Sequence, residues 1–191
     1  MKLLSIDVGI RNLAYVIINV EDVNVHHIEQ WDVLELCGKC DKASNVSNVI
    51  IGENMKKRFN EKFSELVFDK IIIENQIGQN AIKMKTIQGM INMYFIMNGY
   101  NESNIINYNA VHKLKPFQPK DIKLTYADRK KLSKVVTGQL CEKYYGDDIH
   151  TYFLKYKKKD DLADCLLQCI DFIKKQNLIT EEFYIINNEI S

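Results

Sequence analysis

The sequence predicts an α/β fold built on a mixed five-stranded sheet, three strands antiparallel and two parallel, with helices on both faces. Residues 2–19, KLLSIDVGIRNLAYVIIN, hold two apolar runs joined by a short turn that contains Gly and Asn, which is the pattern of a β-hairpin. Residues 71–73 are consecutive isoleucines, typical of a strand buried on both faces in the parallel part of a sheet. Segments with strand and helix patterns then alternate, which favours helices packed against a partly parallel sheet.

The other elements follow from the spacing of apolar residues. Asn54 is a suitable N-cap for the first helix, and the second helix is apolar around more of its surface than one buried face requires. We expect residues 146–156 to be irregular. In chain order, the predicted elements are a third strand (23–34), a helix (54–70), the buried strand (71–73), a helix (80–98), a fifth strand (104–108) and helices at 126–144 and 160–175.

With 191 residues the chain is long enough to bury a substantial core, and it is predicted to form one domain over residues 1–176. Residues 37–53 are expected to be an exposed connection or a small insertion, and residues 177–191 a C-terminal tail. No apolar run reaches the roughly 18 residues that a membrane span needs. Met1 leads directly into the first strand, which leaves no room for a signal peptide. Five cysteines, an odd number, favour a reducing, intracellular compartment.

Cys37 and Cys40 form a lone CxxC motif. A structural zinc ion needs four ligands, and the sequence contains no second CxxC. His26 and His27 complete such a site only if the third strand folds back toward the cysteines. The motif alone is therefore weak support for zinc binding or redox chemistry.

The basic residues are unevenly distributed, although the net charge is only +1. Residues 113–134 contain eight Lys and Arg against two Asp, and a second basic run covers residues 155–159. Such segments supply the electric field and the phosphate contacts that nucleic-acid binding requires. We predict nucleic-acid contacts from Lys115, Lys123, Arg129, Lys130, Lys131, Lys134, Lys157 and Lys158.

Carboxylates from distant segments could converge on one site. Asp7 and Glu74 each end a strand that is predicted to be buried, and they meet at one edge of the sheet if those strands are neighbours. On the last helix, Asp164 shares a polar face with Asp160 and Asp161, since residues three or four apart lie on one side of a helix. Singly, such acids serve in turns or near helix N-termini. Together they form a site of oxygen ligands without His or Cys, which suits Mg²⁺ or Mn²⁺.

Four segments carry a family resemblance: SIDVGIRNLAYVII, IIIENQ, YADRKKLSKVV and KKKDDLADCLLQ. In this order and spacing they are similar to the RuvC-like Holliday junction resolvases, especially the subgroup of large DNA viruses (poxvirus-like) and yeast mitochondria. The resemblance covers nearly the whole chain. It implies a ribonuclease H-like fold, a homodimer and paired nicks across a four-way DNA junction. It also implies that the four metal-binding acids are Asp7, Glu74, Asp161 and Asp164.

The resemblance resolves some of the choices that the residues alone leave open. The D-x-x-D spacing of the family selects Asp161 over Asp160. The family also has a functionally important lysine before the last helix, and Lys130 or Lys131 matches it, with Lys130 slightly favoured. Gln76 fits an E-x-Q pattern of the subgroup, and it either touches DNA or a metal-bound water or caps a turn. The CxxC motif departs from the poxvirus pattern.

The leading hypothesis is therefore a Mg²⁺-dependent endonuclease acting on branched DNA. Two Mg²⁺ ions per site, for which Mn²⁺ can substitute, would activate a water and stabilise the leaving oxygen of the phosphodiester. Asp7 would bridge the two ions, and Lys130 or Lys131 would help to neutralise the phosphate.

Three alternatives stay open. A ribonuclease H, acting on RNA–DNA hybrids, uses the same chemistry, and a non-catalytic junction-binding protein would keep the fold. A phosphotransferase of the actin and sugar-kinase type also opens with a D-x-G strand and turn, but the chain is short for two such lobes. We expect no membrane partner. The expected location is the cytoplasm or, for a viral protein, the viral replication compartment.

Overall fold

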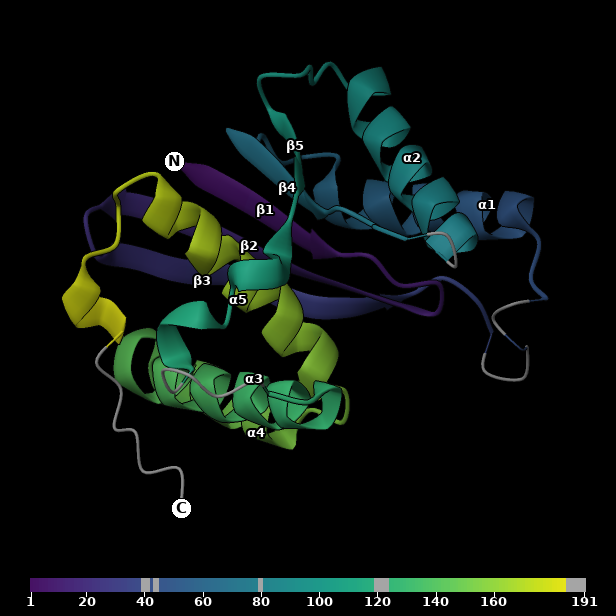
Figure 1. The fold of residues 1–191 in the computed structure, drawn as a ribbon. Coiled ribbons are helices and arrows are strands. Elements are labelled where there is room, and N and C mark those ends of the chain that lie inside the picture. The colour runs from purple at the N-terminus through teal and green to yellow at the C-terminus, as the bar shows by residue number, and fades with distance from the viewer. Residues whose placement is uncertain (39–41, 43–44, 79–80, 119–123, 185–191) are drawn as a thin grey trace.

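The computed structural model describes residues 1–38, 42, 45–78, 81–118 and 124–184, and it confirms the predicted mixed sheet. The strand order is β3-β2-β1-β4-β5, so that the first strand lies at the centre (Figure 1). β1 pairs antiparallel with β2 and parallel with β4, while β3 and β5 complete the antiparallel and parallel sides. The strands are β1 (Lys2–Asp7), β2 (Asn12–Asp22), β3 (Val25–Glu35), β4 (Lys70–Glu74) and β5 (Ile105–Tyr108).

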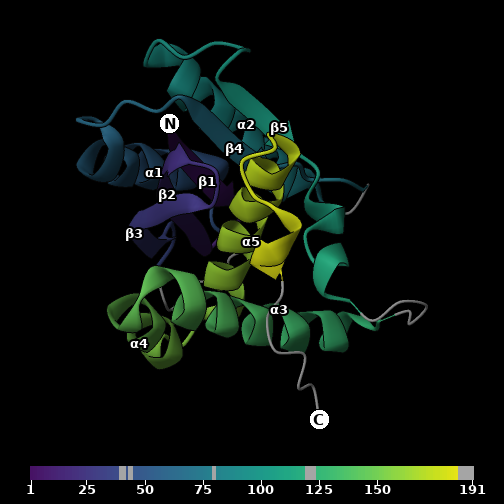
Figure 2. The ribbon, with the colours of Figure 1, turned by 90° about the vertical axis from the view of Figure 1, so that its left-hand side faces the viewer.

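Helices cover both faces of the sheet, as predicted. Figure 2 shows α1 and α2 on one side of the strands and α5 on the other, with α3 and α4 beyond one end of α5. Each face has its own apolar core. The helices are α1 (Asn48–Phe63), α2 (Ile82–Met97), α3 (Tyr126–Leu140), α4 (Asp147–Lys155) and α5 (Lys159–Lys175), with short turns η2 (Ala110–His112), η3 (Lys115–Phe117), η4 (Cys141–Tyr145) and η5 (Glu181–Tyr184).

The alternation of side chains along the central strands decides which face the strand ends serve. In β1, Leu4 and Ile6 belong to the core under α1 and α2, whereas Leu3 belongs to the core under α5. In β4, Ile72 faces α5 and the isoleucines on either side of it face the opposite core. Because successive side chains of a strand point to opposite faces, the last residue of each strand is directed toward α5.

Two helical segments differ from the prediction. The first helix ends at Phe63 and not near Lys70. The first helix begins at Asn48, not near Asn54, because the Ser47 hydroxyl caps it by accepting from the Ile50 amide at 3.2 Å. The Asn54 side chain instead donates to the Leu36 carbonyl at 3.0 Å. Much of the segment predicted to be irregular, residues 147–155, forms helix α4. The pattern of apolar residues in this segment is short. A tertiary contact stabilises the helix, since the Phe153 ring stacks on the Trp31 ring with centroids 5.4 Å apart.

The two histidines of the hypothetical zinc site do not lie near Cys37. His26 is buried and its Nδ1 is bonded to the Tyr145 hydroxyl at 3.0 Å, whereas His27 is exposed and pairs with Glu21. Adjacent strand residues face opposite ways, and Cys37 lies past the other end of β3, roughly 30 Å along the strand. The hypothesis that these residues form a zinc site is therefore wrong. Cys40 lies outside the described residues.

The segments expected to be peripheral are partly packed. Residues 48–53 of the expected exposed connection already belong to α1, and Cys37 is buried. Within the expected tail, Phe183 is buried and stacks on Tyr144 with ring centroids 4.1 Å apart. Leu178, Ile179 and Phe183 therefore pack against the core. Of the helices in the described part of the chain, none has the length and apolar character that crossing a membrane requires.

Candidate active site

Asp7 and Glu74 come together because of the register of the parallel pair. Ile6 pairs with Ile73, so the next residues, Asp7 and Glu74, stand side by side at the strand ends and on the α5 face. The two carboxyl groups share a hydrogen bond. Gln76 secures this edge, since its Nε2 donates to Glu74 Oε2 at 2.8 Å. Gln76 thus contacts the acid directly.

A buried glutamine aligns α5 with these strands. The Nε2 of Gln168, whose side chain is almost fully enclosed, reaches Ser5 Oγ at 3.0 Å and the carbonyls of Ile6 and Ile72 at 3.2 and 3.3 Å. A buried amide that satisfies groups on two strands fixes the helix against them, because leaving those groups unpaired would cost free energy. Asp164 lies one helical turn before Gln168, and it is thereby held beside the ends of β1 and β4.

Asp7 interacts with both of the other acids. Burial, and then the charges of Glu74 and Asp164, raise the pKa of Asp7 well above its usual range. A carboxyl group is disfavoured in its charged form when it is buried beside other carboxylates. The structure therefore brings together three of the four predicted acids, in a cluster that favours binding of a cation.

Lys113 also reaches into this cluster, although it was not among the predicted site residues. It follows β5 and the turn η2, which the Asn109 side chain caps at the Val111 amide. Its Nζ lies 2.6 Å from Asp164 Oδ1, and its side chain is only 13% exposed. Burial alone would lower the pKa of Lys113, but attraction to Asp164, Asp7 and Glu74 outweighs burial and raises it. The sequence placed Lys113 in a basic segment, but no local pattern linked it to the acids.

Asp161 and Lys130 lie beside the cluster. Burial, followed by the charge of Asp160, raises the pKa of Asp161. Its Oδ2 is buried without a hydrogen-bond partner among the described residues. Lys130 pairs with Asp160 at 2.9 Å and lies over the ring of Tyr126, 5.2 Å from its centroid. The orphaned Asp161 oxygen is a group that a bound cation would satisfy.

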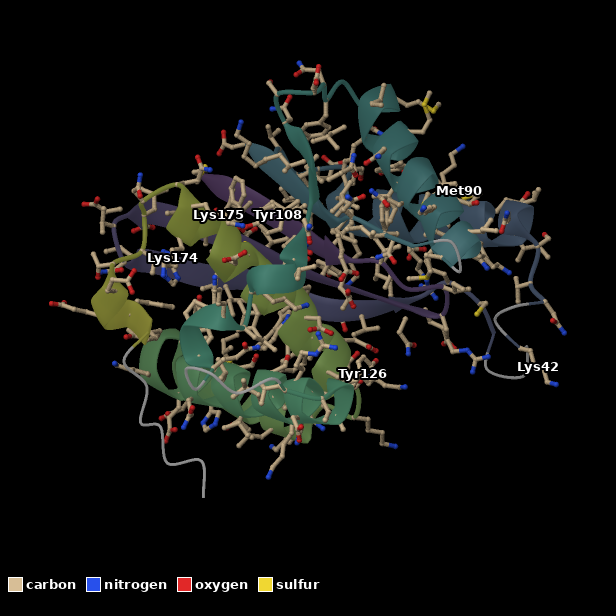
Figure 3. All side chains as sticks on the ribbon, in the orientation of Figure 1. Lys42, Met90, Tyr108, Tyr126, Lys174 and Lys175 are labelled. Carbon is tan, nitrogen blue, oxygen red and sulfur yellow. The ribbon has the colours of Figure 1, made fainter. Side chains whose placement is uncertain are left out.

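A cavity of about 260 Å³ connects the acids to the basic segment. Acidic and basic side chains share its wall, so a phosphate and a divalent cation could occupy it together. Figure 3 shows Tyr126 near the N-terminal end of α5, away from Lys174, Lys175 and Tyr108. The charged and aromatic lining residues are Glu74, Lys113, Tyr126, Arg129, Lys130, Asp160 and Asp164.

The donor set fits a hard divalent cation in kind, since Asp7, Glu74, Asp161 and Asp164 offer only oxygen atoms. In their present positions, however, no three His, Cys, Asp or Glu side chains of the described residues are arranged to hold a metal ion. One of these acids, Asp164, is paired with the Lys113 ammonium.

The other predicted nucleic-acid contacts surround the cavity or lie further out. Arg129 and Lys130 line it, whereas Lys115 lines a second cavity of about 370 Å³ together with Lys174 and Lys175. There the buried carboxylate of Asp171 accepts from the Tyr108 hydroxyl at 2.7 Å. The remaining described candidates are exposed, and they are Lys131, Lys134, Lys157 and Lys158. Lys123 lies outside the described residues.

Comparison with models of known protein families shows the family of this chain. Residues 1–176 match the model of the family described as poxvirus A22 protein. The chain belongs to this family. The poxvirus A22 proteins are a Holliday junction resolvase family, and the predicted resemblance is thereby confirmed.

Relatives of this A22-family chain are found among viral sequences and solved structures. Uncharacterized protein L451 of Acanthamoeba polyphaga mimivirus is 29% identical over 127 residues, which are 58% of this chain and 30% of that protein. This chain thus spans about a third of the length of that relative.

Solved structures of resolvases share the fold of this A22-family chain. The fowlpox virus resolvase, solved with Holliday junction DNA, has a TM-score of 0.61 at 21% identity, covering 92% of this chain and 99% of that one. The yeast mitochondrial Holliday junction resolvase Ydc2 has a TM-score of 0.63 at 16% identity, covering 95% and 82%. Thermus thermophilus RuvC with a Holliday junction substrate has 0.56 at 13% identity, covering 92% and 96%. The predicted ribonuclease H-like fold is thereby confirmed.

Proposed function

We propose that this chain is a structure-specific endonuclease that resolves four-way DNA junctions by paired, symmetric nicks. The observation that carries the proposal is the interaction of Asp7 with Glu74 and Asp164 at one edge of the sheet. Glu74 and Asp164 line a cavity that Arg129 and Lys130 also line. Acids alone repel a phosphodiester, and basic residues alone attract it without a means of cleaving it. Both in one cavity suit metal-assisted phosphodiester hydrolysis. Family membership supports the same activity.

The four acids would hold Mg²⁺, two ions per site, with Mn²⁺ as a substitute. Bound divalent cations supply activation of a water and stabilisation of the leaving oxygen. Asp7 interacts with both Glu74 and Asp164, which supports the proposal that its carboxylate would help to hold both ions. Asp161 would contribute the oxygen that lacks a partner.

The surrounding residues orient the acids and the substrate. Gln76 holds Glu74 in place through its hydrogen bond. Lys130 is the residue we assign to neutralising the phosphate under attack, because it lines the cavity next to Asp160 whereas Lys131 points to solvent. Arg129 and the exposed lysines would contact the DNA backbone further from the cleavage point.

We infer that the active form is a homodimer, because two symmetric nicks require two active sites. The surface that favours this is the outer face of α2, where several large apolar side chains are more than half exposed. An exposed apolar face of this kind is typical of a protein interface. These residues are Ile82, Met93, Ile96 and Met97. As a member of a poxvirus family, the chain is expected to act where viral DNA replicates, in the cytoplasm.

An immobile four-way junction incubated with the protein and Mg²⁺ tests the proposal. We expect two symmetric nicks that a DNA ligase can seal. Asp7→Asn should abolish cleavage and leave junction binding largely intact. The same preparation, offered an RNA–DNA hybrid in competition, should prefer the junction, which separates the proposal from a ribonuclease H. Cleavage by Asp7→Asn, or binding without nicking by the wild type, would refute the proposed active site.

A further inference from the structure

We propose that Lys113 is a built-in counter-cation of the acidic cluster, which holds Asp164 in the metal-free protein and moves to a DNA phosphate oxygen when a divalent cation binds. This inference rests on the proposed function. Its consequence is that metal and DNA bind cooperatively. Metal binding to Asp164 releases Lys113 for the DNA, and DNA binding to Lys113 releases Asp164 for the metal.

The contact itself carries the argument. Lys113 Nζ lies 2.6 Å from Asp164 Oδ1, a short charge-assisted bond, and the lysine side chain is 13% exposed. Lys113 interacts also with Asp7 and Glu74. A lysine is almost never buried to this extent unless its charge is compensated. Here the acids provide that compensation, and the lysine in turn reduces their mutual repulsion.

A divalent cation and Lys113 compete for the same carboxylate group, that of Asp164. Mg²⁺ binds carboxylate oxygens at roughly 2.0–2.1 Å and accepts little deviation from its geometry. The ammonium also interacts with Asp7 and Glu74, and it repels a second cation among these acids. Metal binding by all these acids therefore requires Lys113 to leave Asp164.

The cavity offers the displaced lysine an alternative partner. Lys113 lines the cavity of about 260 Å³ together with Arg129 and Lys130. A phosphodiester attracted by those two residues would bring an anionic oxygen to the wall from which Lys113 projects. The lysine then exchanges one anion for another, without leaving its charge buried and unpaired.

Titration of the full-length protein with Mn²⁺ by calorimetry, without DNA, tests the competition. Lys113→Met keeps the length of the side chain and removes the charge, and it should bind Mn²⁺ about tenfold more tightly than the wild type, or better. Lys113→Arg, which keeps the charge, should bind as weakly as the wild type. Lys115→Met removes an exposed charge two residues away and should leave Mn²⁺ affinity unchanged. Lys113→Gln serves in place of Lys113→Met if that variant does not fold.

The outcomes separate this inference from the proposed function. If Asp7→Asn abolishes Mn²⁺ binding while Lys113→Met binds no more tightly than the wild type, the counter-cation role is wrong and the metal site stands. If Mn²⁺ binding is insensitive to Asp7→Asn, the metal site itself is wrong.

Junction affinity, measured by fluorescence anisotropy, tests the second half of the exchange. In EDTA, Lys113 is held by Asp164, and Lys113→Met should bind the junction as the wild type does. In Ca²⁺, which takes oxygen ligands with a looser geometry, the variant should bind roughly ten- to a hundredfold more weakly, the loss expected for one charge-assisted hydrogen bond. An equal loss in both conditions, or none in either, would rule out the exchange.

Discussion

Two lysine–aspartate pairs flank the start of α5, and they differ in their surroundings more than in their geometry. Lys113 and Asp164 are 2.6 Å apart, with the lysine 13% exposed. Lys130 and Asp160 are 2.9 Å apart, with the lysine 42% exposed. The buried lysine faces several acids, whereas the exposed lysine faces one acid and a tyrosine ring.

The contribution of an ion pair to stability depends on how deeply the pair is buried. An exposed pair contributes about 0–1 kcal/mol and its lysine is free to attract DNA. In a buried pair, removal of one partner leaves an uncompensated charge and costs about 3–5 kcal/mol. In the metal-free protein we therefore assign the Lys113 pair to the organisation of the acids and the Lys130 pair to the contact with substrate.

Replacing the two aspartates should give the largest contrast. Asp164→Asn should reduce junction cleavage on the order of 10³-fold or more, because it removes a charge that would hold the metal ions. Asp160→Asn should reduce cleavage about tenfold or less, because it frees Lys130 without touching the cluster. Single-turnover cleavage of a labelled junction measures both. Equal losses would show that the first turn of α5 acts as one unit and would end the distinction.

The dependence of junction affinity on salt concentration should also distinguish Lys113 from Lys130. Junction affinity in EDTA should fall roughly 10³-fold between about 50 and 200 mM salt if six or so phosphates are contacted. Lys130→Met should reduce the slope of log affinity against log salt by about one, and Lys113→Met should leave it unchanged. A titration monitored by anisotropy at several salt concentrations gives the slopes. A smaller slope for Lys113→Met in EDTA would place this lysine on the DNA before metal binds.

The free energy of unfolding without metal should depend on the buried pair of Lys113 and Asp164. In EDTA at about pH 8, Lys113→Met should lose about 2–3 kcal/mol, less than the full cost of an unpaired charge because Asp7 can take up a proton. Lys130→Met should lose under about 1 kcal/mol. Added Mg²⁺ should restore much of the stability of Lys113→Met. Denaturant unfolding followed by circular dichroism measures these differences, and a larger loss for Lys130→Met would reverse the assignment.

The smallest effect concerns Asp7, whose pKa is raised by burial and by Glu74 and Asp164. The folded protein then binds this proton more tightly than the unfolded chain does, so the charged carboxylate destabilises the fold at pH values above the raised pKa. In EDTA, Asp7→Asn should melt a few degrees higher than the wild type at about pH 8, and this advantage should shrink as the pH falls through the pKa of Asp7. Calorimetric melting curves from about pH 8 to about pH 5 test it. A difference in melting temperature that does not depend on pH would mean that the pKa of Asp7 is not raised.

Much of the site could be predicted from the sequence because it depends on strand periodicity. Asp7 and Glu74 end buried strands, and a two-residue repeat directs both toward the same helix once the strands are neighbours. The acids of α5 are spaced so that they share one side of a helix. These are local rules, and in the structure Asp7 interacts with both Glu74 and Asp164.

The errors have a common cause in contacts between distant segments. Helix α4 depends on the stacking of Phe153 on Trp31, and the start of α1 depends on a serine cap that the apolar spacing does not reveal. Lys113 looked like one of several lysines in a basic segment. Its different role follows from the course of the chain after β5, which carries it back to α5.

The mixed sheet follows from residue type and from spacing within a few turns or strands, and so do the strand ends and the helix face on which acids occur. Only the tertiary structure decided which lysine enters the acidic cluster, that Asp161 lies at its margin, and that Gln168 sets the position of α5. The physical reason is that burial and charge interactions depend on distance in space, and residues more than fifty positions apart along the chain, such as Lys113 and Asp164, come together only in the fold.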